Sequence, residues 1–221
     1  MDEYLSLLKF HFENHRNEQL AEPMKKYMKD HFPFLGIKKP ERAKLMRTFF
    51  QQSGILQQPI QTEFIKNLWE QKEREYQYAA MDYLDKVLKK LDNNHLPLLE
   101  WLITTKSWWD TVDALATKSV GAVAKKYPET IPETIEAWAY GEHLWLRRTA
   151  ILFQLKYKIE TDEALLYRYI VQNADSKEFF IQKAIGWVLR EYSKANPDSV
   201  RNFIASHPLA KLSIREGCKY L

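Results

Sequence analysis

The residues of this sequence that best suit chemistry are Asp113 and Trp109, a carboxylate and an indole placed four positions apart. Positions four apart share a face of a helix, so the two side chains are expected side by side if this segment is helical. A carboxylate attracts positive charge, and so does the π face of an indole. A solvent-exposed aspartate beside a packed tryptophan gives the same pattern, so the spacing alone leaves both interpretations open.

The neighbouring polar residues have a simpler explanation than Asp113. In the segment Ser107-Trp108-Trp109-Asp110-Thr111-Val112-Asp113, Ser107 is predicted to cap a helix. Asp110 then falls at the third helical position, where a carboxylate is favoured by the helix dipole and by capping. Asp113 lies beyond that first turn, so capping does not account for it.

A second indole, Trp187, lies in the segment Lys183-Ala184-Ile185-Gly186-Trp187-Val188-Leu189-Arg190. A glycine inside a helix costs about 1 kcal/mol relative to alanine. Gly186 is therefore expected where the backbone approaches either a neighbouring helix or a ligand. Trp187 itself fits packing in the core as well as a place in a binding cleft.

Basic residues are clustered in several segments, although the net charge of +4 is by itself weak support for nucleic-acid binding. If these clusters share one side of the fold, they form a groove that binds phosphates. The sequence does not show which side each residue takes. The clusters comprise Lys25, Lys26 and Lys29 around Tyr27; Lys38, Lys39 and Arg42; Arg147 and Arg148; Lys156 and Lys158; and Lys183, Arg190 and Lys194.

Other kinds of site have little support. His11 and His15 are four positions apart, but no third ligand accompanies them, so no metal site is expected. The chain has no glycine-rich phosphate loop and no local pattern of a serine or cysteine nucleophile.

The sequence predicts a cytoplasmic protein. Its one cysteine, Cys218, has no internal partner for a disulfide, which suits a reducing compartment. The N-terminus lacks the pattern of a signal peptide. No run approaches the roughly 20 apolar residues that a membrane helix needs, so no membrane association is expected.

The elements that must position these residues are all predicted to be helices. Apolar residues recur with the helical period, while strand alternation and hairpin turns are missing. Paired helices repeat every 35–45 residues or so, the spacing of HEAT-type repeats. We therefore expect one all-α domain over residues 1–221, a curved superhelical solenoid of HEAT-like helical pairs, with a globular bundle as the alternative. The predicted helices are 3–15, 19–31, 40–52, 62–71, 74–91, 95–105, 107–126, 132–140, 142–158, 162–172, 177–195, 198–206 and 208–220.

Several blocks of the sequence resemble the AlkD-type DNA alkylation repair family. They extend over most of the chain and are highly specific together. They are Ala21-Glu22-Pro23-Met24-Lys25-Lys26-Tyr27-Met28-Lys29, Phe34-Leu35-Gly36-Ile37, Pro40-Glu41-Arg42, Thr105-Lys106-Ser107-Trp108-Trp109-Asp110, Ala150-Ile151-Leu152-Phe153-Gln154-Leu155-Lys156-Tyr157-Lys158, and Lys177-Glu178-Phe179-Phe180-Ile181-Gln182-Lys183-Ala184-Ile185-Gly186-Trp187-Val188-Leu189-Arg190-Glu191-Tyr192.

The resemblance implies an enzyme built of HEAT-like repeats that removes N3- and N7-alkylated purines, such as 3-methyladenine and 7-methylguanine, from double-stranded DNA. Asp113 matches the family's catalytic aspartate, and Trp109 and Trp187 match its two cleft tryptophans. Arg148 matches a phosphate-contacting arginine, and Tyr27 a tyrosine on the DNA-facing surface. This complete set indicates an active member. The basic residues expected to bind DNA with them are Lys156, Lys183 and Arg190.

The chemistry of such lesions suits these residues. Alkylation at N3 or N7 makes the purine a cationic leaving group, and cleavage of its glycosidic bond moves positive charge onto the sugar. A fixed Asp113 carboxylate about 4 Å away would contribute roughly 4 kcal/mol at an effective dielectric near 20. That is about a thousandfold in rate if the attraction is felt only in the transition state. Asp113 could also position the attacking water.

We therefore expect a monofunctional glycosylase that acts as a monomer without a metal or other cofactor. No lysine is placed as a Schiff-base nucleophile, so strand cleavage is not expected. The resemblance further implies a cleft that engages the backbone and sugar of the lesion without a pocket for a flipped base. Its rival is a non-catalytic HEAT-repeat scaffold that binds DNA or protein, which leaves Asp113 unexplained because a carboxylate repels phosphate. An RNA-binding array would need a regular code of base-reading residues, which is missing.

Overall fold

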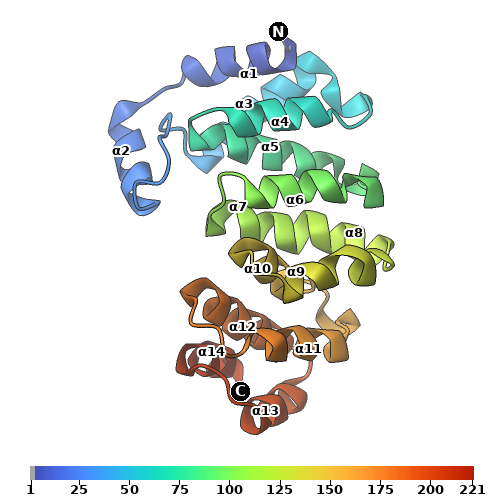
Figure 1. Cartoon of the computed structure of the whole chain (residues 1–221). Helices are drawn as coiled ribbons and strands as arrows, with labels where there is room; N and C mark the ends of the chain where they lie inside the picture. Colours follow the sequence, from blue (N-terminus) through green and yellow to red (C-terminus); the bar gives the residue numbers. More distant parts are fainter. Residues whose placement is uncertain (1–2) are drawn as a thin grey trace. The chain divides into compact units, whose positions relative to one another are not determined.

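The computed structural model describes residues 3–221, and over that range its regular structure is helical, with no strand (Figure 1). This confirms the predicted all-α class. The chain divides into two compact units, Met1–Lys90 and Leu91–Leu221. The prediction of a single repeat domain stays a prediction. Within the described residues, no helix has both the length and the apolar character needed to cross a membrane.

The first unit contains five α-helices in the part that the structure describes. They are α1 (Glu3–Glu13), α2 (Glu18–Tyr27), α3 (Lys39–Ser53), α4 (Thr62–Glu70) and α5 (Arg74–Val87). The second unit begins with α6 (Leu96–Thr104), α7 (Trp109–Ala114), α8 (Gly121–Lys126), α9 (Glu136–Tyr140) and α10 (Leu144–Leu152), and it ends with α11 (Glu163–Asn173), α12 (Phe179–Tyr192), α13 (Pro197–Ser206) and α14 (Lys211–Gly217).

Helix α3 shows how the sequence sets the limits of an element. Pro40 occupies its first turn, where a residue without an N–H loses no hydrogen bond. Gly54 ends it with φ of +62° and donates its N–H to the carbonyl of Phe50 at 3.2 Å. The predicted helix 40–52 is confirmed, and its apolar stripe is buried at Leu45, Met46, Phe49 and Phe50.

A buried carboxylate fixes the connection between α2 and α3. Glu75, at the start of α5, has no exposed surface and accepts the backbone N–H groups of Leu35 at 2.9 Å, Gly36 at 2.9 Å and Ile37 at 3.1 Å. Burial raises the pKa of Glu75, and the three N–H donors oppose that rise. Gly36 has φ of +90°, and a Cβ there would lie 2.0 Å from the carbonyl oxygen of Asn17. The segment therefore requires glycine for both conformation and space.

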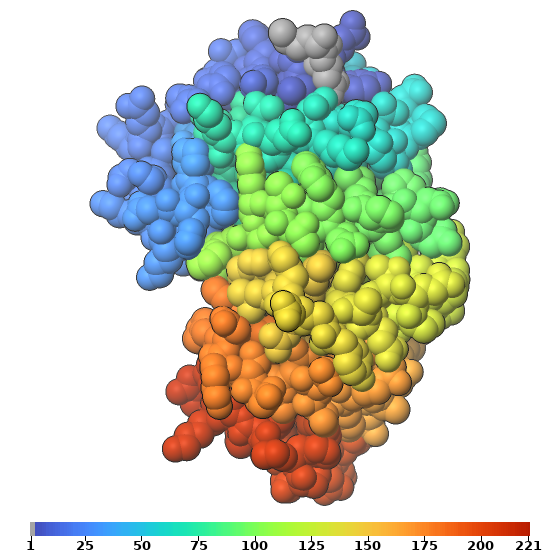
Figure 2. Space-filling view, in the orientation of Figure 1, coloured from blue at the N-terminus to red at the C-terminus, as the bar shows by residue number. Residues whose placement is uncertain are grey.

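Helix α2 is a surface element. None of its residues is buried, and its atoms form a lobe on the surface of the first unit (Figure 2). It begins at the cap Asn17, whose side chain accepts the N–H of Leu20. Its end at Tyr27 comes before the predicted end at residue 31, because Lys29 and Asp30 take left-handed backbone angles. The helix thus presents Tyr27 and its lysines to solvent.

The core of the second unit is built around α12. Buried apolar residues of this helix recur at helical spacing, at Ile181, Ala184, Ile185, Val188 and Leu189. They pack with buried residues of α10, α11 and α13. Helix α10 packs against both α7 and α12, and these three helices carry the candidate site.

The predicted helix 107–126 is interrupted in the structure. Trp108, with extended backbone, occupies the N-cap position, and the Ser107 hydroxyl donates to the carbonyl of Ile103 at 2.6 Å. The predicted cap at Ser107 is therefore wrong. Between α7 and α8 the chain forms a π-helical segment, Leu115–Val120. Such segments are often found at functional sites, and this one begins two residues after Asp113.

Helix α10 is shorter than the predicted helix 142–158. It ends at Leu152, and the turns that follow lead to Lys158, which has φ of +56°. The Gln154 side chain accepts the N–H of Asp162 at 2.8 Å and donates to its carbonyl at 3.3 Å. These hydrogen bonds close the loop before α11, so periodicity alone placed the helix end too late.

Candidate active site

The centre of the candidate site is an ion pair between the half-buried Asp113 on α7 and the buried Arg148 on α10. The Arg148 Nε donates to one carboxylate oxygen of Asp113 at 2.7 Å, and Nη2 donates to the other at 2.9 Å. The Asp113 side chain is 15% exposed and the Arg148 side chain is 5% exposed. The two-pronged geometry fixes the plane and direction of the carboxylate, which a single contact would not do.

Opposing effects act on the Asp113 carboxyl. Burial is the largest and raises its pKa, because a charged group loses hydration in the interior. The hydrogen bonds and positive charge of Arg148 oppose that rise, while the nearby carboxylate of Asp110 adds to it. The net result is a pKa above the usual value for aspartate. Asp113 is therefore a carboxylate whose charge depends on its partner.

Arg148 also connects the pair to α12. Its Nη1 donates to the main-chain carbonyl of Phe180, in the first turn of that helix. The guanidinium thus contacts residues from two helices besides its own. Three of its five N–H groups are used, and within the described residues the other two have no acceptor.

The two predicted cleft tryptophans differ in their surroundings. Trp109 is the first residue of α7 and is half-buried, and it lies on the same helix as Asp113 as expected. Trp187 on α12 is also half-buried and packs against the hydrophobic core of the second unit. A Cβ at Gly186 would lie 2.5 Å from the Cβ of Glu216. The close approach predicted at this glycine is therefore to the neighbouring helix α14.

Two of the predicted DNA-binding residues share an acidic partner that the sequence did not reveal. Lys183 and Arg190 approach the Glu216 carboxylate at 3.2 Å and 3.3 Å, and Lys219 approaches it at 2.7 Å. Hydrogen bonds from Lys219 and then Lys183 lower the pKa of Glu216 to about 2. The cluster has three cations on one carboxylate, so a net positive charge remains at this surface.

The other predicted DNA-binding residues are more exposed. Tyr27 on α2 is 69% exposed and borders a cavity of about 270 Å³ that also includes Lys38. Lys156 is exposed, and no ion pair involves it among the described residues. Tyr27 belongs to the first unit and Lys156 to the second.

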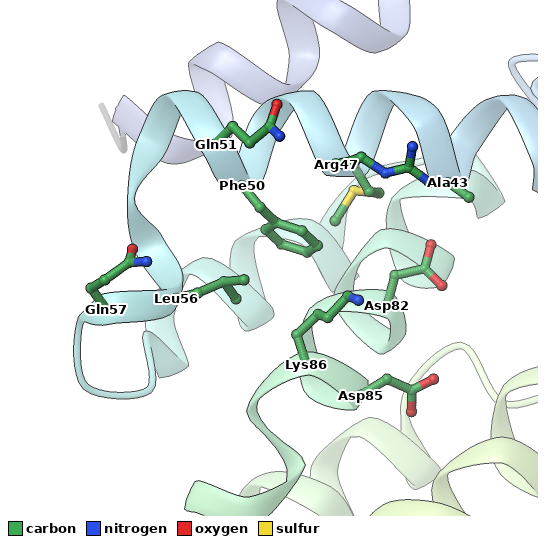
Figure 3. Close-up of a pocket in the computed structure, with 10 residues that line it drawn as sticks. Ala43, Arg47, Phe50, Gln51, Leu56, Gln57, Asp82, Asp85 and Lys86 are labelled. Carbon is green, nitrogen blue, oxygen red and sulfur yellow. The ribbon is translucent and has the colours of Figure 1, made fainter.

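A larger cavity of about 580 Å³ lies in the first unit, between α3 and α5 (Figure 3). Phe50 points into it, and the charged groups of Arg47, Asp82 and Lys86 surround it. It includes none of the residues that the sequence predicted for a site. Asp82 is already paired with Arg42 at 2.8 Å. The candidate site is therefore identified by its chemistry and not by cavity size.

The histidines form ordinary polar contacts. The Nε2 of His11 lies 2.7 Å from the side-chain oxygen of Gln52, and the Nδ1 of His15 lies 2.8 Å from the carbonyl of His11. Over residues 3–221, no three His, Cys, Asp or Glu side chains gather in a way that could hold a metal ion.

Comparison with known proteins connects this geometry to a family. The family model for DNA alkylation repair enzymes matches residues 8–221. A solved structure from Enterococcus faecalis, described as a predicted DNA alkylation repair enzyme, is 35% identical in sequence. It superimposes with a TM-score of 0.86 and covers 94% of this chain and 97% of its own. No curated protein matches the chain. The chain belongs to the DNA alkylation repair enzyme family.

Proposed function

We propose that this protein is a monofunctional DNA glycosylase that hydrolyses the N-glycosidic bond of N3- and N7-alkylated purines in double-stranded DNA. The observation that carries the proposal is the Asp113 carboxylate, half-buried on α7 one turn after Trp109 and held on both oxygens by Arg148. Solvent-exposed aspartates do not require such a partner. The family acts in repair of alkylated DNA, and a purine alkylated at N3 or N7 carries a positive charge that the Asp113 carboxylate would attract.

The proposed reaction needs little acid catalysis. The base leaves with the electrons of its glycosidic bond and becomes neutral, while the sugar carbon becomes electron-poor. Water then adds its oxygen to that carbon and releases a proton to Asp113 or to solvent. The Asp113 carboxylate stabilises the developing positive charge, and the indole faces of Trp109 and Trp187 would add about 0.5–2 kcal/mol each where they face the cation.

Arg148 limits how far the field of Asp113 extends, because a paired cation cancels most of its potential at a distance. A DNA phosphate that accepts the two unused N–H groups of Arg148 would offset that cation. The carboxylate would then act on the sugar at nearly full strength. Arg148 would then make both the phosphate contact that the resemblance implies and the contact to Asp113.

The remaining predicted contacts are proposed to hold the duplex. Lys156 and the cluster of Lys183 and Arg190 supply positive charge on the second unit, and Tyr27 supplies an exposed ring on the first. Phosphate contacts of this kind position the DNA without reading its sequence. The selectivity is proposed to come from the charge and lability of the lesion, without a pocket for a flipped base.

We also propose that the helices form HEAT-like pairs and that the protein acts as a monomer without a cofactor. Support for the pairing comes from contacts between helices close in sequence, such as α4 with α5, α9 with α10, and α12 with α14. Contacts of this local kind are typical of repeat arrays. Sedimentation of the protein alone and bound to a short duplex tests the monomer.

The test is release of 7-methylguanine from a methylated duplex under single-turnover conditions. The wild-type protein should release the base, and Asp113→Asn should lower the rate by about a thousandfold while DNA affinity stays within a few fold. Because the reaction needs ionised Asp113, the wild-type rate should rise with pH through a pKa above the usual aspartate value. Equal rates for the two proteins would rule out the role of Asp113, and DNA binding without any release would support the scaffold alternative.

A further inference from the structure

Arg148 lies against a cluster of three aromatic rings. The ring of Phe180 has its centroid 4.9 Å from that of Trp145 and 5.1 Å from that of Trp108, and the two tryptophan rings are 5.8 Å apart. The guanidinium carbon of Arg148 lies 5.7 Å from the centre of the Phe180 ring. Each ring therefore contacts both of the others, so the position of one depends on the other two.

Each ring stands at the beginning of a helix that carries a candidate site residue. Trp108 is the N-cap of α7, which carries Asp113. Trp145 is the second residue of α10 and lies one turn before Arg148. Phe180 is the second residue of α12, two turns before Trp187 on the same face. The cluster thus joins the starts of the three helices that supply the site.

The cluster is connected to the carboxylate through Arg148. Arg148 donates to the carbonyl of Phe180, and with its other two engaged groups it holds both oxygens of Asp113. The place of that carbonyl is set by the packing of the Phe180 ring against Trp145 and Trp108. A smaller or displaced ring would let the carbonyl move, and the guanidinium would lose its third contact.

We propose that Trp145 and Phe180 are positioning residues that hold Arg148, and through it Asp113, in the orientation that base release requires. The expected effect on the rate of base release rests on the proposed glycosylase function. The expected effect on the pKa of Asp113 does not. Neither ring needs to touch the substrate. Displacements of about 1 Å in a site can lower a rate by about a hundredfold, so loss of this packing should be visible in the kinetics.

The charge state of Asp113 gives a readout that does not depend on catalysis. The charged groups that act on it are Arg148 from α10 and Asp110 from α7. When Arg148 is held less firmly, its pKa-lowering effect weakens, and burial and Asp110 still raise the pKa. Loosening the ring cluster should therefore move the pKa of Asp113 upward, whether or not a lesion is bound.

The experiment compares Phe180→Leu and the milder Trp145→Phe with a matched control, Phe203→Leu. Phe203 is a buried ring of the same unit, stacked on Tyr167 with centroids 4.0 Å apart, and it lies on α13, outside the three helices that carry Asp113, Arg148 and Trp187. Each protein is titrated with ¹³C-labelled aspartate to follow the Asp113 carboxyl by NMR, with assignment from Asp113→Asn. Single-turnover release of 7-methylguanine and affinity for the methylated duplex are measured beside it.

We expect a higher Asp113 pKa in Phe180→Leu and a smaller rise in Trp145→Phe, with no change in Phe203→Leu. The release rate should fall about 10- to 100-fold in Phe180→Leu, with affinity changed less than threefold. Equal pKa values in all proteins, or an equal loss of rate in Phe203→Leu, would overturn the inference. If the wild type releases no base but the pKa rises as expected, the glycosylase proposal fails and the positioning role stands. If Phe180→Leu does not fold, Trp145→Phe decides in the same way.

Discussion

Replacement of Arg148 by alanine should destabilise the second unit strongly and in a pH-dependent way. The substitution leaves the half-buried Asp113 carboxylate without Arg148, its one ion-pair partner among residues 3–221. Arg148 is buried and Asp113 is half-buried, with side chains 5% and 15% exposed, so the pair is much closer to a buried pair than to an exposed one. Removal of one member of a buried pair costs about 3–5 kcal/mol, whereas an exposed pair contributes about 1 kcal/mol or less.

The pH dependence follows from the carboxyl left behind. In Arg148→Ala, the pKa of Asp113 in the folded protein should rise further above its value in the unfolded chain. The folded state then binds more protons than the unfolded state, so the free energy of unfolding falls as pH rises from about 4 to neutrality. The loss relative to wild type should therefore be largest near pH 7 and small near pH 4.

The assay is urea unfolding followed by tryptophan fluorescence. Only Trp69 of the seven tryptophans lies in the first unit, so the signal reports mainly on the second. Arg168→Ala is a matched control, because its pair with Glu136 at 2.9 Å is 51% and 34% exposed. The double variant Asp113→Asn/Arg148→Ala removes both charges and should be more stable at pH 7 than Arg148→Ala alone. A loss of less than 1 kcal/mol in Arg148→Ala, or one independent of pH, would refute the reasoning.

Three further predictions concern DNA binding and helix packing. Lys156→Ala should lower the slope of log DNA affinity against log salt concentration by about one unit. Lys183→Ala should lower that slope less, because Lys183 is already paired with Glu216. Affinities measured between about 50 and 200 mM salt check both. Glu216→Gln should strengthen DNA binding severalfold and weaken the fold most above pH 4.5. The folded-state pKa of about 2 lies below the usual value, so the stabilising effect of ionised Glu216 is fully present above pH 4.5 and shrinks as pH falls toward 2; unfolding should show a larger loss at pH 7 than at pH 2.5. Gly186→Ala should cost about 1–3 kcal/mol in urea unfolding, since the added Cβ would lie 2.5 Å from the Cβ of Glu216, and a loss below 0.5 kcal/mol would contradict this packing.

Much of the secondary structure followed from local sequence rules. Pro40 and Gly54 mark the two ends of α3, and Asp162 caps α11 by accepting the N–H of Leu165 at 3.0 Å. The rules failed where a distant contact or an unusual backbone ended a helix. The side chain of Gln154 closes the loop after α10, and the left-handed angles of Lys29 end the run after α2. Such contacts leave no periodic signal in the sequence.

The candidate site was predictable in part. The spacing of Trp109 and Asp113 placed both on one helix, because that spacing is a property of the helix alone. The partnership of Asp113 with Arg148 spans 35 positions and depends on how α7 packs against α10. No local rule gives such a packing. Lys183 and Arg190 both lie on α12, but their shared partner Glu216 comes from α14, which the sequence did not indicate.

Glu75 shows the limit of reading charge from sequence. At the start of a helix, an Arg-Glu pair such as Arg74-Glu75 is ordinarily solvent-exposed, yet both residues are fully buried here. The Glu75 carboxylate replaces water with three backbone N–H groups, and the Arg74 guanidinium lies 3.8 Å from the centre of the Phe32 ring. Only the assembled loop and helix provide those partners, so the burial of these charges could not be predicted from the sequence.

The Asp113–Arg148 pair combines requirements that oppose each other. Burial strengthens the field of the carboxylate and excludes water, but it also favours the protonated form, which has no field to offer. Arg148 opposes protonation, although its charge weakens the same field, which the proposed phosphate contact would restore. A well-packed apolar pair would be at least as stable as this one. Stability therefore does not explain why these two charges are removed from water, whereas the proposed function does, because it needs an ionised carboxylate beside a cationic sugar.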